Sequence, residues 1–343
     1  MNIFELLKYT VDEGCSDLHL SSGEVPVVRK NGDLIKIENQ PVLTNDIVKE
    51  MLHDIMTDAH RALLEKQSEV DFSYAVDDVA RFRINAFHQA RGLSAALRSL
   101  AFETPTLETM GLSGGVFKKI CEYPNGLVLI TGATGSGKST TLAAIINYIN
   151  SIENRGEHII TIEDPVEYIF KSDQCLIQQR ELGRDTRYFH DALRAALRED
   201  PDIIMIGEMR DLDTIRLALT AAETGHLVFG TLHTRSAPSA IDRIIDVFPG
   251  NEKDMIREIL AQSLRAIIAQ RLLKTPDGTI RPVYEILICT DAVRNLIREH
   301  KIPQLISVMQ TGRKFGMQTM QQHIEELLGE NKILPVDDGT PES

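Results

Sequence analysis

The chain has 343 residues, 43% of them hydrophobic and 25% charged, which is typical of a globular protein with two domains. Its 37 basic and 50 acidic residues give a net charge of −13, and this acidity argues against bulk nucleic acid as the main partner. The four cysteines form no C-x-x-C pair, so neither a zinc site nor a disulfide framework is expected.

The amino-terminal sequence MNIFELLKYTVDEG contains acidic side chains and no long apolar stretch, so it does not predict a signal peptide. No apolar run approaches the roughly 20 residues that a membrane-spanning helix needs. We therefore expect a cytoplasmic protein.

Residues 1–100 are expected to form a first domain of mixed helices and strands. Apolar residues at helical spacing predict a helix over residues 3–11, with Gly14 just beyond its end. Alternating apolar residues in 70–76 and 82–86 predict the two strands of a hairpin.

The rest of the chain is expected to contain a linker, a second domain and a tail. One proline and three glycines predict a linker over residues 101–115. The second domain is expected to cover residues 116–334. The polar sequence PVDDGTPES predicts a disordered tail over residues 335–343.

Short apolar runs alternate with helical segments in the second domain, which is typical of a parallel sheet covered by helices. The runs are residues 127–131, 158–162, 203–206 and 227–231. Residues 251–329 are predicted to be mostly helical, because apolar residues recur there at helical spacing. These residues are Met255, Ile259, Leu260, Leu264, Ile267 and Ile268. The expected fold class is α/β.

A phosphate-binding loop is predicted at residues 132–139, which match G-x-x-x-x-G-K-[ST] between an expected strand and an expected helix. The predicted nucleotide-binding residues are Gly132, Ala133, Thr134, Gly135, Ser136, Gly137, Lys138, Ser139 and Thr140. Glycines let backbone N–H groups turn toward phosphates, and the helix N-terminus adds a positive dipole end. We expect Lys138 to reach the β- and γ-phosphates and Ser139 to bind Mg²⁺, so ATP and Mg²⁺ are the predicted ligands.

Polar side chains follow three of the expected strands, at the sheet edge where the phosphate-binding loop lies. Glu163 and Glu208 each follow one strand, and His233 follows another. Either glutamate can activate the attacking water while the other helps to hold Mg²⁺. His233, with His226 as a second candidate, is a possible sensor of the γ-phosphate. The alternative for each residue is a structural role, such as a helix cap or a solvated charge.

Three segments resemble, in the same order, the Asp box, Walker B and His box of the secretion-ATPase superfamily. They read HIITIEDPVEY, DPDIIMIGEMRD and AAETGHLVFGTLHT. Generic P-loop ATPases have an aspartate before the Walker B glutamate, whereas this chain has Gly207, as the secretion ATPases do. The resemblance extends to GCSDLHL and RFRINAFHQARGLSAALR in the first domain and covers nearly the whole chain.

This resemblance implies a PAS-like N-terminal domain, a RecA-like ATPase domain and a homo-hexameric ring with nucleotide at the subunit boundaries. It implies that Glu163 is the water-activating base and Glu208 the Walker B acid. It also implies that three arginines of the first domain complete the nucleotide site, some of them from a neighbouring subunit. These are Arg81, Arg83 and Arg98. The alternative for Arg81 and Arg83 is a solvated strand face.

Two further arginine pairs are singled out by the sequence. Arg194 and Arg198 are either nucleotide sensors or surface charges, and the sequence leaves both open. Residues 292–299 resemble the AIRNLIRE motif of the pilus-retraction branch, with Val293 in place of isoleucine. On a helix, Val293 faces the core while Arg294 and Arg298 form a separate stripe.

The resemblance therefore implies a hexameric motor that powers type IV pilus retraction and works with an inner-membrane platform protein at the cytoplasmic face. A pilus-assembly or type II secretion ATPase is the alternative within the superfamily. It is disfavoured because those enzymes carry an extra N-terminal domain and usually a four-cysteine zinc module. A P-loop also occurs in three further classes of protein: a slowly hydrolysing nucleotide-switched scaffold, a P-loop kinase and a DNA translocase, the last disfavoured by the acidic charge.

Overall fold

The computed structural model describes residues 2–30, 32–76, 80–100, 104–112 and 115–335. Two compact units are present. The first contains Met1–Thr104 and Pro165–Ile169, and the second contains Pro105–Asp164 and Phe170–Ser343. The expected α/β class is confirmed in both units. No helix within the described ranges is long and apolar enough to cross a membrane.

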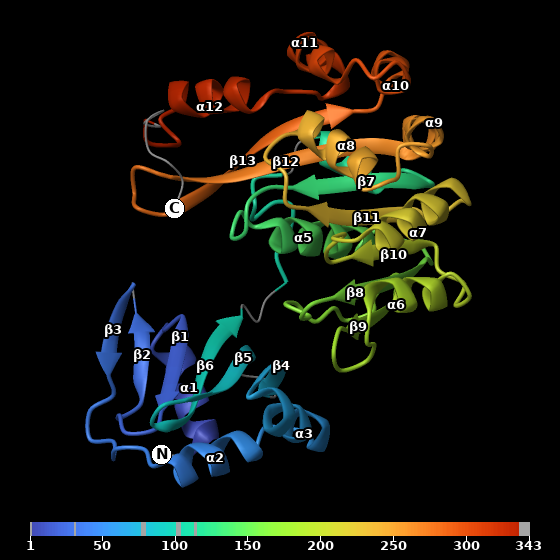
Figure 1. The fold of residues 1–343 in the computed structure, drawn as a ribbon. Helices are drawn as coiled ribbons and strands as arrows, with labels where there is room; N and C mark the ends of the chain where they lie inside the picture. Colours follow the sequence, from blue (N-terminus) through green and yellow to red (C-terminus); the bar gives the residue numbers. More distant parts are fainter. Residues whose placement is uncertain (1, 31, 77–79, 101–103, 113–114, 336–343) are drawn as a thin grey trace. The chain divides into compact units, whose positions relative to one another are not determined.

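The first unit contains a six-stranded antiparallel sheet whose strands lie in the order β3-β2-β1-β6-β5-β4 (Figure 1). The strands are β1 (Asp17–Ser21), β2 (Val27–Lys30), β3 (Asp33–Lys36), β4 (Glu69–Val76), β5 (Ala80–Gln89) and β6 (Gly92–Leu100). The helices are α1 (Ile3–Asp12), α2 (Asn45–His53) and α3 (Asp58–Gln67). The predicted helix and hairpin strands are thus present as α1, β4 and β5.

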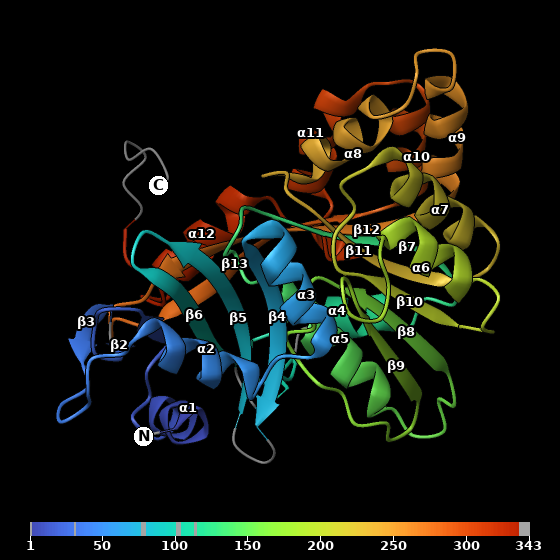
Figure 2. The same ribbon diagram turned by 60° about the horizontal axis from the view of Figure 1, so that its bottom comes forward.

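The helices of the first unit cover one face of its sheet, as Figure 2 shows for α2 and α3. Leu6 of α1 and Val48 of α2 belong to the same buried cluster as Leu18 and Phe82 of the sheet. Because side chains alternate along a strand, the neighbours of these sheet residues lie on the opposite face. That face carries the arginines of β5 and β6.

The second unit is built on a seven-stranded sheet with the order β13-β12-β7-β11-β10-β8-β9. The strands are β7 (Gly126–Thr131), β8 (His158–Glu163), β9 (Leu176–Glu181), β10 (Ile203–Ile206), β11 (Leu227–Leu232), β12 (Leu264–Lys274) and β13 (Ile280–Ile288). All neighbouring strands are parallel except β12 and β13. This arrangement confirms the predicted parallel sheet and places the carboxyl ends of β7, β8, β10 and β11 at one edge.

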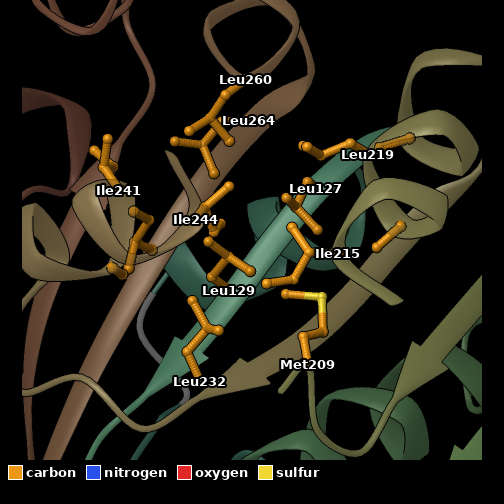
Figure 3. Close-up of a cluster of buried hydrophobic side chains, with 14 of the residues drawn as sticks. Leu127, Leu129, Met209, Ile215, Leu219, Leu232, Ile241, Ile244, Leu260 and Leu264 are labelled. Carbon is orange, nitrogen blue, oxygen red and sulfur yellow. The ribbon is translucent and has the colours of Figure 1, made fainter. Parts of the chain in front are cut away.

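Helices cover both faces of this sheet. They are α4 (Gly115–Cys121), α5 (Lys138–Asn150), α6 (Phe189–Ala196), α7 (Leu212–Glu223), α8 (Ala237–Asp246), α9 (Lys253–Ser263), α10 (Asp291–Arg298), α11 (Leu305–Thr311) and α12 (Met320–Gly329). One buried cluster joins Leu127 and Leu129 of β7 to Ile215 of α7 and Ile244 of α8 (Figure 3). A second cluster, on the other face, contains residues of α4 and α5.

The prediction that residues 251–329 are mostly helical is wrong for the two long strands β12 and β13. Ile267 and Ile268 of β12 are both buried, but they belong to different clusters on the two faces of the sheet. A strand covered on both faces has no alternation of apolar and polar residues. Its apolar residues happened to continue the helical spacing of α9.

The expected linker, 101–115, also differs from the structure. From Pro105 onward the described residues belong to the second unit, where Leu107 and Leu112 are buried. Two leucines among threonines and glycines are too few to show a periodic pattern. Residues 101–103, 113–114 and all of the expected tail beyond Pro335 lie outside the described residues.

Candidate active site

The phosphate-binding loop joins β7 to α5, as predicted. Gly132, Gly135 and Gly137 have positive φ angles of 152°, 77° and 86°, which side-chain-bearing residues rarely adopt. Helix α5 starts at Lys138, and its N-cap residue Gly137 has no side chain that could cap the helix. The loop therefore has the backbone geometry of an anion site.

Lys138 lies over this loop and is only 9% exposed. Its Nζ donates to the carbonyl oxygens of Gly132, at 2.8 Å, and Ala133, at 2.9 Å. Ala133, Thr134 and Ser139 are exposed at the same loop. The ammonium group is thus held at the mouth of the loop, where phosphate oxygens can replace the two carbonyls.

Glu163 and Glu208 lie at the carboxyl ends of the adjacent strands β8 and β10, where Ile162 pairs with Ile206. Gly207 brings the two strand ends close together, because its N–H donates to the carbonyl of Ile162 at 2.7 Å. A Cβ at position 207 would lie 3.1 Å from that carbonyl oxygen and 3.2 Å from the Cα of Glu163. This tight approach explains why glycine stands where generic P-loop ATPases carry aspartate.

Glu163 is 8% exposed, and neighbouring side chains donate hydrogen bonds to its carboxylate. The Thr161 hydroxyl donates to Glu163 Oε1 at 2.6 Å, and the Gln179 amide donates to the same oxygen at 3.1 Å. Thr161 lies on the same strand and Gln179 on the neighbouring β9. These bonds fix the orientation of the carboxylate at the sheet edge.

The Glu208 carboxylate forms an ion pair with Arg210. His233 Nε2 lies 2.9 Å from Glu208 Oε1. Burial alone would raise the pKa of Glu208, but the Arg210 hydrogen bond and the nearby charges outweigh it and lower this pKa. Burial and the Lys138 charge lower the pKa of His233 despite the nearby carboxylate. At neutral pH the pair is therefore a carboxylate beside a neutral imidazole.

The loop after β11 is tied to the strand that leads into the phosphate-binding loop. The backbone N–H of Thr234 donates to the Thr131 hydroxyl at 2.9 Å, and the Thr131 and Thr234 hydroxyls are 2.7 Å apart. Strands β7 and β11 are paired along their whole length. The structure thus brings Lys138, Glu208 and His233 together at one edge, as predicted.

The interpretation of His226 as a sensor of the γ-phosphate is wrong for its own subunit. His226 precedes β11, whereas His233 follows it, so the two lie at opposite edges of the sheet, about 20 Å apart. His226 Nδ1 lies 3.0 Å from the carbonyl oxygen of Ala221, and its backbone carbonyl accepts from Gly126. The segment AAETGHLVFGTLHT, which resembles the His box, contains both histidines, but the six-residue strand β11 separates them.

Arg81, Arg83 and Arg98 lie on the face of the first unit's sheet that is opposite to the buried cluster with α1, α2 and α3. Arg83 pairs across the strands with Arg98, and Arg98 with Asp17. Arg98 Nε lies 3.0 Å from Asp17 Oδ1, and Arg81 donates to the Ser73 hydroxyl. The three arginines thus lie on one face, where Arg83, Arg98 and the Asp17 carboxylate form a row across β5, β6 and β1.

The two remaining arginine pairs lie on the second unit. Arg194 is exposed on α6, and Arg198 is exposed beyond the helix, which ends at Ala196. On α10, Val293 and Ile297 are fully buried, as the helical spacing predicts. Arg294 forms an ion pair with Asp291 in its own helix, and Arg298 forms an ion pair with Glu258 on α9. Arg294 is half-buried whereas Arg298 is exposed, so only part of this arginine stripe faces solvent.

Two residues at the loop were missed by the sequence analysis. Arg210 lies within the quoted Walker B segment, but no role was given to it. Gln270 lies in β12, where a helix was expected, and it is 1% exposed. A single buried amide inside an apolar run was the available signal.

A cavity of about 800 Å³ lies beside the phosphate-binding loop. Its lining includes Gln270, Met110, Gly137, Thr140, Leu272 and Arg281.

The model of the family described as type II/IV secretion system protein matches residues 2–332. The chain belongs to this family. The type IV pilus retractation ATPase PilT of Pseudomonas aeruginosa is 52% identical over 333 residues, 97% of this chain and 96% of that protein. A twitching motility protein of Neisseria gonorrhoeae is 53% identical over 311 residues, 90% of this chain and 82% of that protein.

The solved structures agree with this membership of the type II/IV secretion system family. A crystal structure titled as the pilus retraction motor PilT with bound ADP is 47% identical to this chain. It superposes with a TM-score of 0.91 and covers 98% of this chain and 95% of that chain. The family resemblance that the sequence motifs indicated is confirmed.

Proposed function

We propose that this chain is a subunit of an ATP-hydrolysing motor that powers the retraction of type IV pili. Two observations support this proposal most strongly. The first is a phosphate-binding loop in which Lys138 lies beside carboxylates at strand ends. The second is 52% identity to a pilus retraction ATPase over nearly the whole chain. The identity supports the biological role, and the arrangement of the site supports the chemistry.

The loop would hold the β- and γ-phosphates through its backbone N–H groups and the N-terminus of α5. Lys138 would exchange its two carbonyl contacts for phosphate oxygens. The cavity beside Gly137 and Thr140 opens next to the loop, so it is the proposed place for the nucleoside. The second unit would then hold both the phosphates and the nucleoside.

The donor groups at this edge fit Mg²⁺, which prefers oxygen ligands and takes one or two carboxylates together with phosphate oxygens. The Ser139 hydroxyl is exposed at the start of α5, and Glu208 stays ionised because of its lowered pKa. Glu163 is the second carboxylate at this edge. The bound ion would supply positive charge near the transferred phosphoryl group.

Glu163 is the proposed general base for the attacking water. A lowered pKa makes Glu208, which is paired with Arg210, a weak base. Glu163 is also held rigidly by Thr161 and Gln179. His233 touches Glu208, so it is placed to respond when the occupancy of the phosphate site changes.

The motor is proposed to be a homo-hexamer that works with an inner-membrane pilus platform protein at the cytoplasmic face. Arg81, Arg83 and Arg98 are proposed to contact nucleotide phosphates, some of them on a neighbouring subunit. An arginine keeps its charge and binds phosphate with two parallel N–H groups. Light scattering with ATP should give the hexamer mass. Mixing Lys138→Ala subunits with Arg83→Ala subunits should restore part of the activity if the arginine acts on a neighbour.

The experiment that tests this function is to delete the protein in its own host and count surface pili. A retraction motor predicts that pili remain but no longer shorten. A pilus-assembly ATPase predicts that pili are absent, and a type II secretion ATPase predicts normal pili with failed protein export. A slowly hydrolysing scaffold predicts that the purified chain releases almost no phosphate from ATP.

A further inference from the structure

Gln270 lies at the centre of β12, beside the strand that leads into the phosphate-binding loop. Its neighbour Ala269 pairs with Thr131, the last residue of β7. The Gln270 side chain is 1% exposed. A buried amide is costly unless both its donor and its acceptor are used, so its hydrogen bonds need an explanation.

Both ends of the Gln270 amide are used, and both bonds reach the loop or its helix. Gln270 Nε2 donates to the carbonyl oxygen of Ser136 at 2.7 Å. The hydroxyl of Thr141, a fully buried residue of α5, donates to Gln270 Oε1 at 2.7 Å. The side chain thus joins the middle of the loop to the first turns of the helix that follows it.

The loop also packs on Gln270 at both of its outer glycines. A Cβ at Gly132 would lie 2.5 Å from the Gln270 carbonyl oxygen, and a Cβ at Gly137 would lie 2.8 Å from Gln270 Nε2. Real Cβ atoms do not approach other atoms so closely. The requirement for glycine at these positions therefore comes partly from residue 270, in addition to the positive φ angles.

The bond to Ser136 fixes the direction of a backbone N–H group. The carbonyl of Ser136 and the N–H of Gly137 belong to one planar, trans peptide, so they point in opposite directions. Because Gln270 holds the carbonyl toward β12, the Gly137 N–H points away from β12. We propose that Gln270 is a positioning residue that aims the Gly137 N–H at the nucleotide phosphates. This inference rests on the proposed ATPase function.

The proposal is tested by replacing each partner with a side chain of similar size that lacks the bond. Gln270→Met fills the same space without an amide, and Thr141→Val removes the hydroxyl. Thr141→Ser keeps the hydroxyl and is the conservative rescue. Gln321→Met is the matched control, because Gln321 is exposed and its amide donates to Glu325 in its own helix.

The measurements are equilibrium binding of a fluorescent ADP analogue, kcat and KM for ATP, and the melting temperature of the full chain. Gln270→Met and Thr141→Val should each bind the analogue about three- to tenfold more weakly and raise KM similarly. The double variant should lose less than the product of the two, because the residues share a bond. Thr141→Ser and Gln321→Met should bind as the wild type does.

Wild-type binding by a folded Gln270→Met variant would overturn the proposal. So would a loss of binding that only follows a lowered melting temperature, as a purely structural role predicts. If Gln270→Met does not fold, Thr141→Val against Thr141→Ser decides the question. Failure of the proposed function is distinguishable, because the Lys138→Ala variant would then bind and hydrolyse ATP as the wild type does.

Discussion

Gly207→Ala is the substitution that most directly tests the close approach of the two strand ends that carry Glu163 and Glu208. Gly207 does not need a positive φ, so alanine is compatible with the backbone conformation. The new Cβ would lie 3.1 Å from the backbone oxygen of Ile162 and 3.2 Å from the Cα of Glu163. Neither atom can rotate away as a flexible side chain can, so β8 and β10 must move apart by a few tenths of an ångström.

Overpacking of this kind costs about 1–3 kcal/mol. For a domain of this size it should lower the melting temperature by about 2–12 °C. The larger effect is expected on catalysis, because the displaced atoms carry Glu163 and Glu208. A misplacement of about 1 Å can cost about 100-fold, so we expect a smaller shift to reduce kcat by about tenfold or more.

The assay is phosphate release from ATP, measured well below the melting temperature of the variant. Gly250→Ala is the matched control, because no atom lies within 4 Å of the Cβ position there and its φ is not positive. Gly250→Ala should leave both turnover and melting temperature close to those of the wild type. If Gly207→Ala also hydrolyses ATP at the wild-type rate, the argument that this glycine sets the spacing of the two carboxylates is refuted.

Glu163→Gln and Glu208→Gln should each bind ATP but hydrolyse it about 10²- to 10⁴-fold more slowly, and near-normal rates in both would contradict the assigned roles. Replacing Arg294 and Arg298 with alanine should leave the hexamer intact and reduce hydrolysis modestly, but stop pilus retraction in live cells. This result is expected if α10 transmits the motion of the motor to the pilus machinery. Retraction that falls only in proportion to hydrolysis would argue against this role. Because the folded-state pKa of His233 is lowered, the unfolded chain binds this proton first, and stability should fall as the pH drops below about 6.5. His233→Asn should therefore flatten the fall in melting temperature between about pH 7 and pH 5.5, and an unchanged slope would count against the neutral imidazole.

The sequence predicted those parts of the site that depend on local order along the chain. The phosphate-binding loop, Glu163, Glu208 and His233 all lie at the carboxyl ends of short parallel strands, which meet at one edge of the sheet. The same rule places His226, which precedes β11, at the opposite edge from His233, which follows it. Only the position of a residue before or after its strand decides which edge it reaches.

The parts that the sequence did not predict depend on packing between distant segments. Strand β12 is covered on both faces, so its apolar run has no period of two and was interpreted as a helix. Gln270 was missed with it, because its partners Ser136 and Thr141 lie about 130 residues earlier in the chain. The burial of Leu107 in the second unit is likewise a tertiary contact with no local signal.

The central claim is that ATP hydrolysis at this P-loop drives the shortening of pili. The most direct measurement is to follow labelled pili in living cells whose only copy of the protein carries Lys138→Ala. The account predicts that these cells extend pili but do not retract them, while cells with the wild-type protein do both. Retraction at the wild-type speed in the Lys138→Ala cells, with no other copy of the motor present, would contradict the claim.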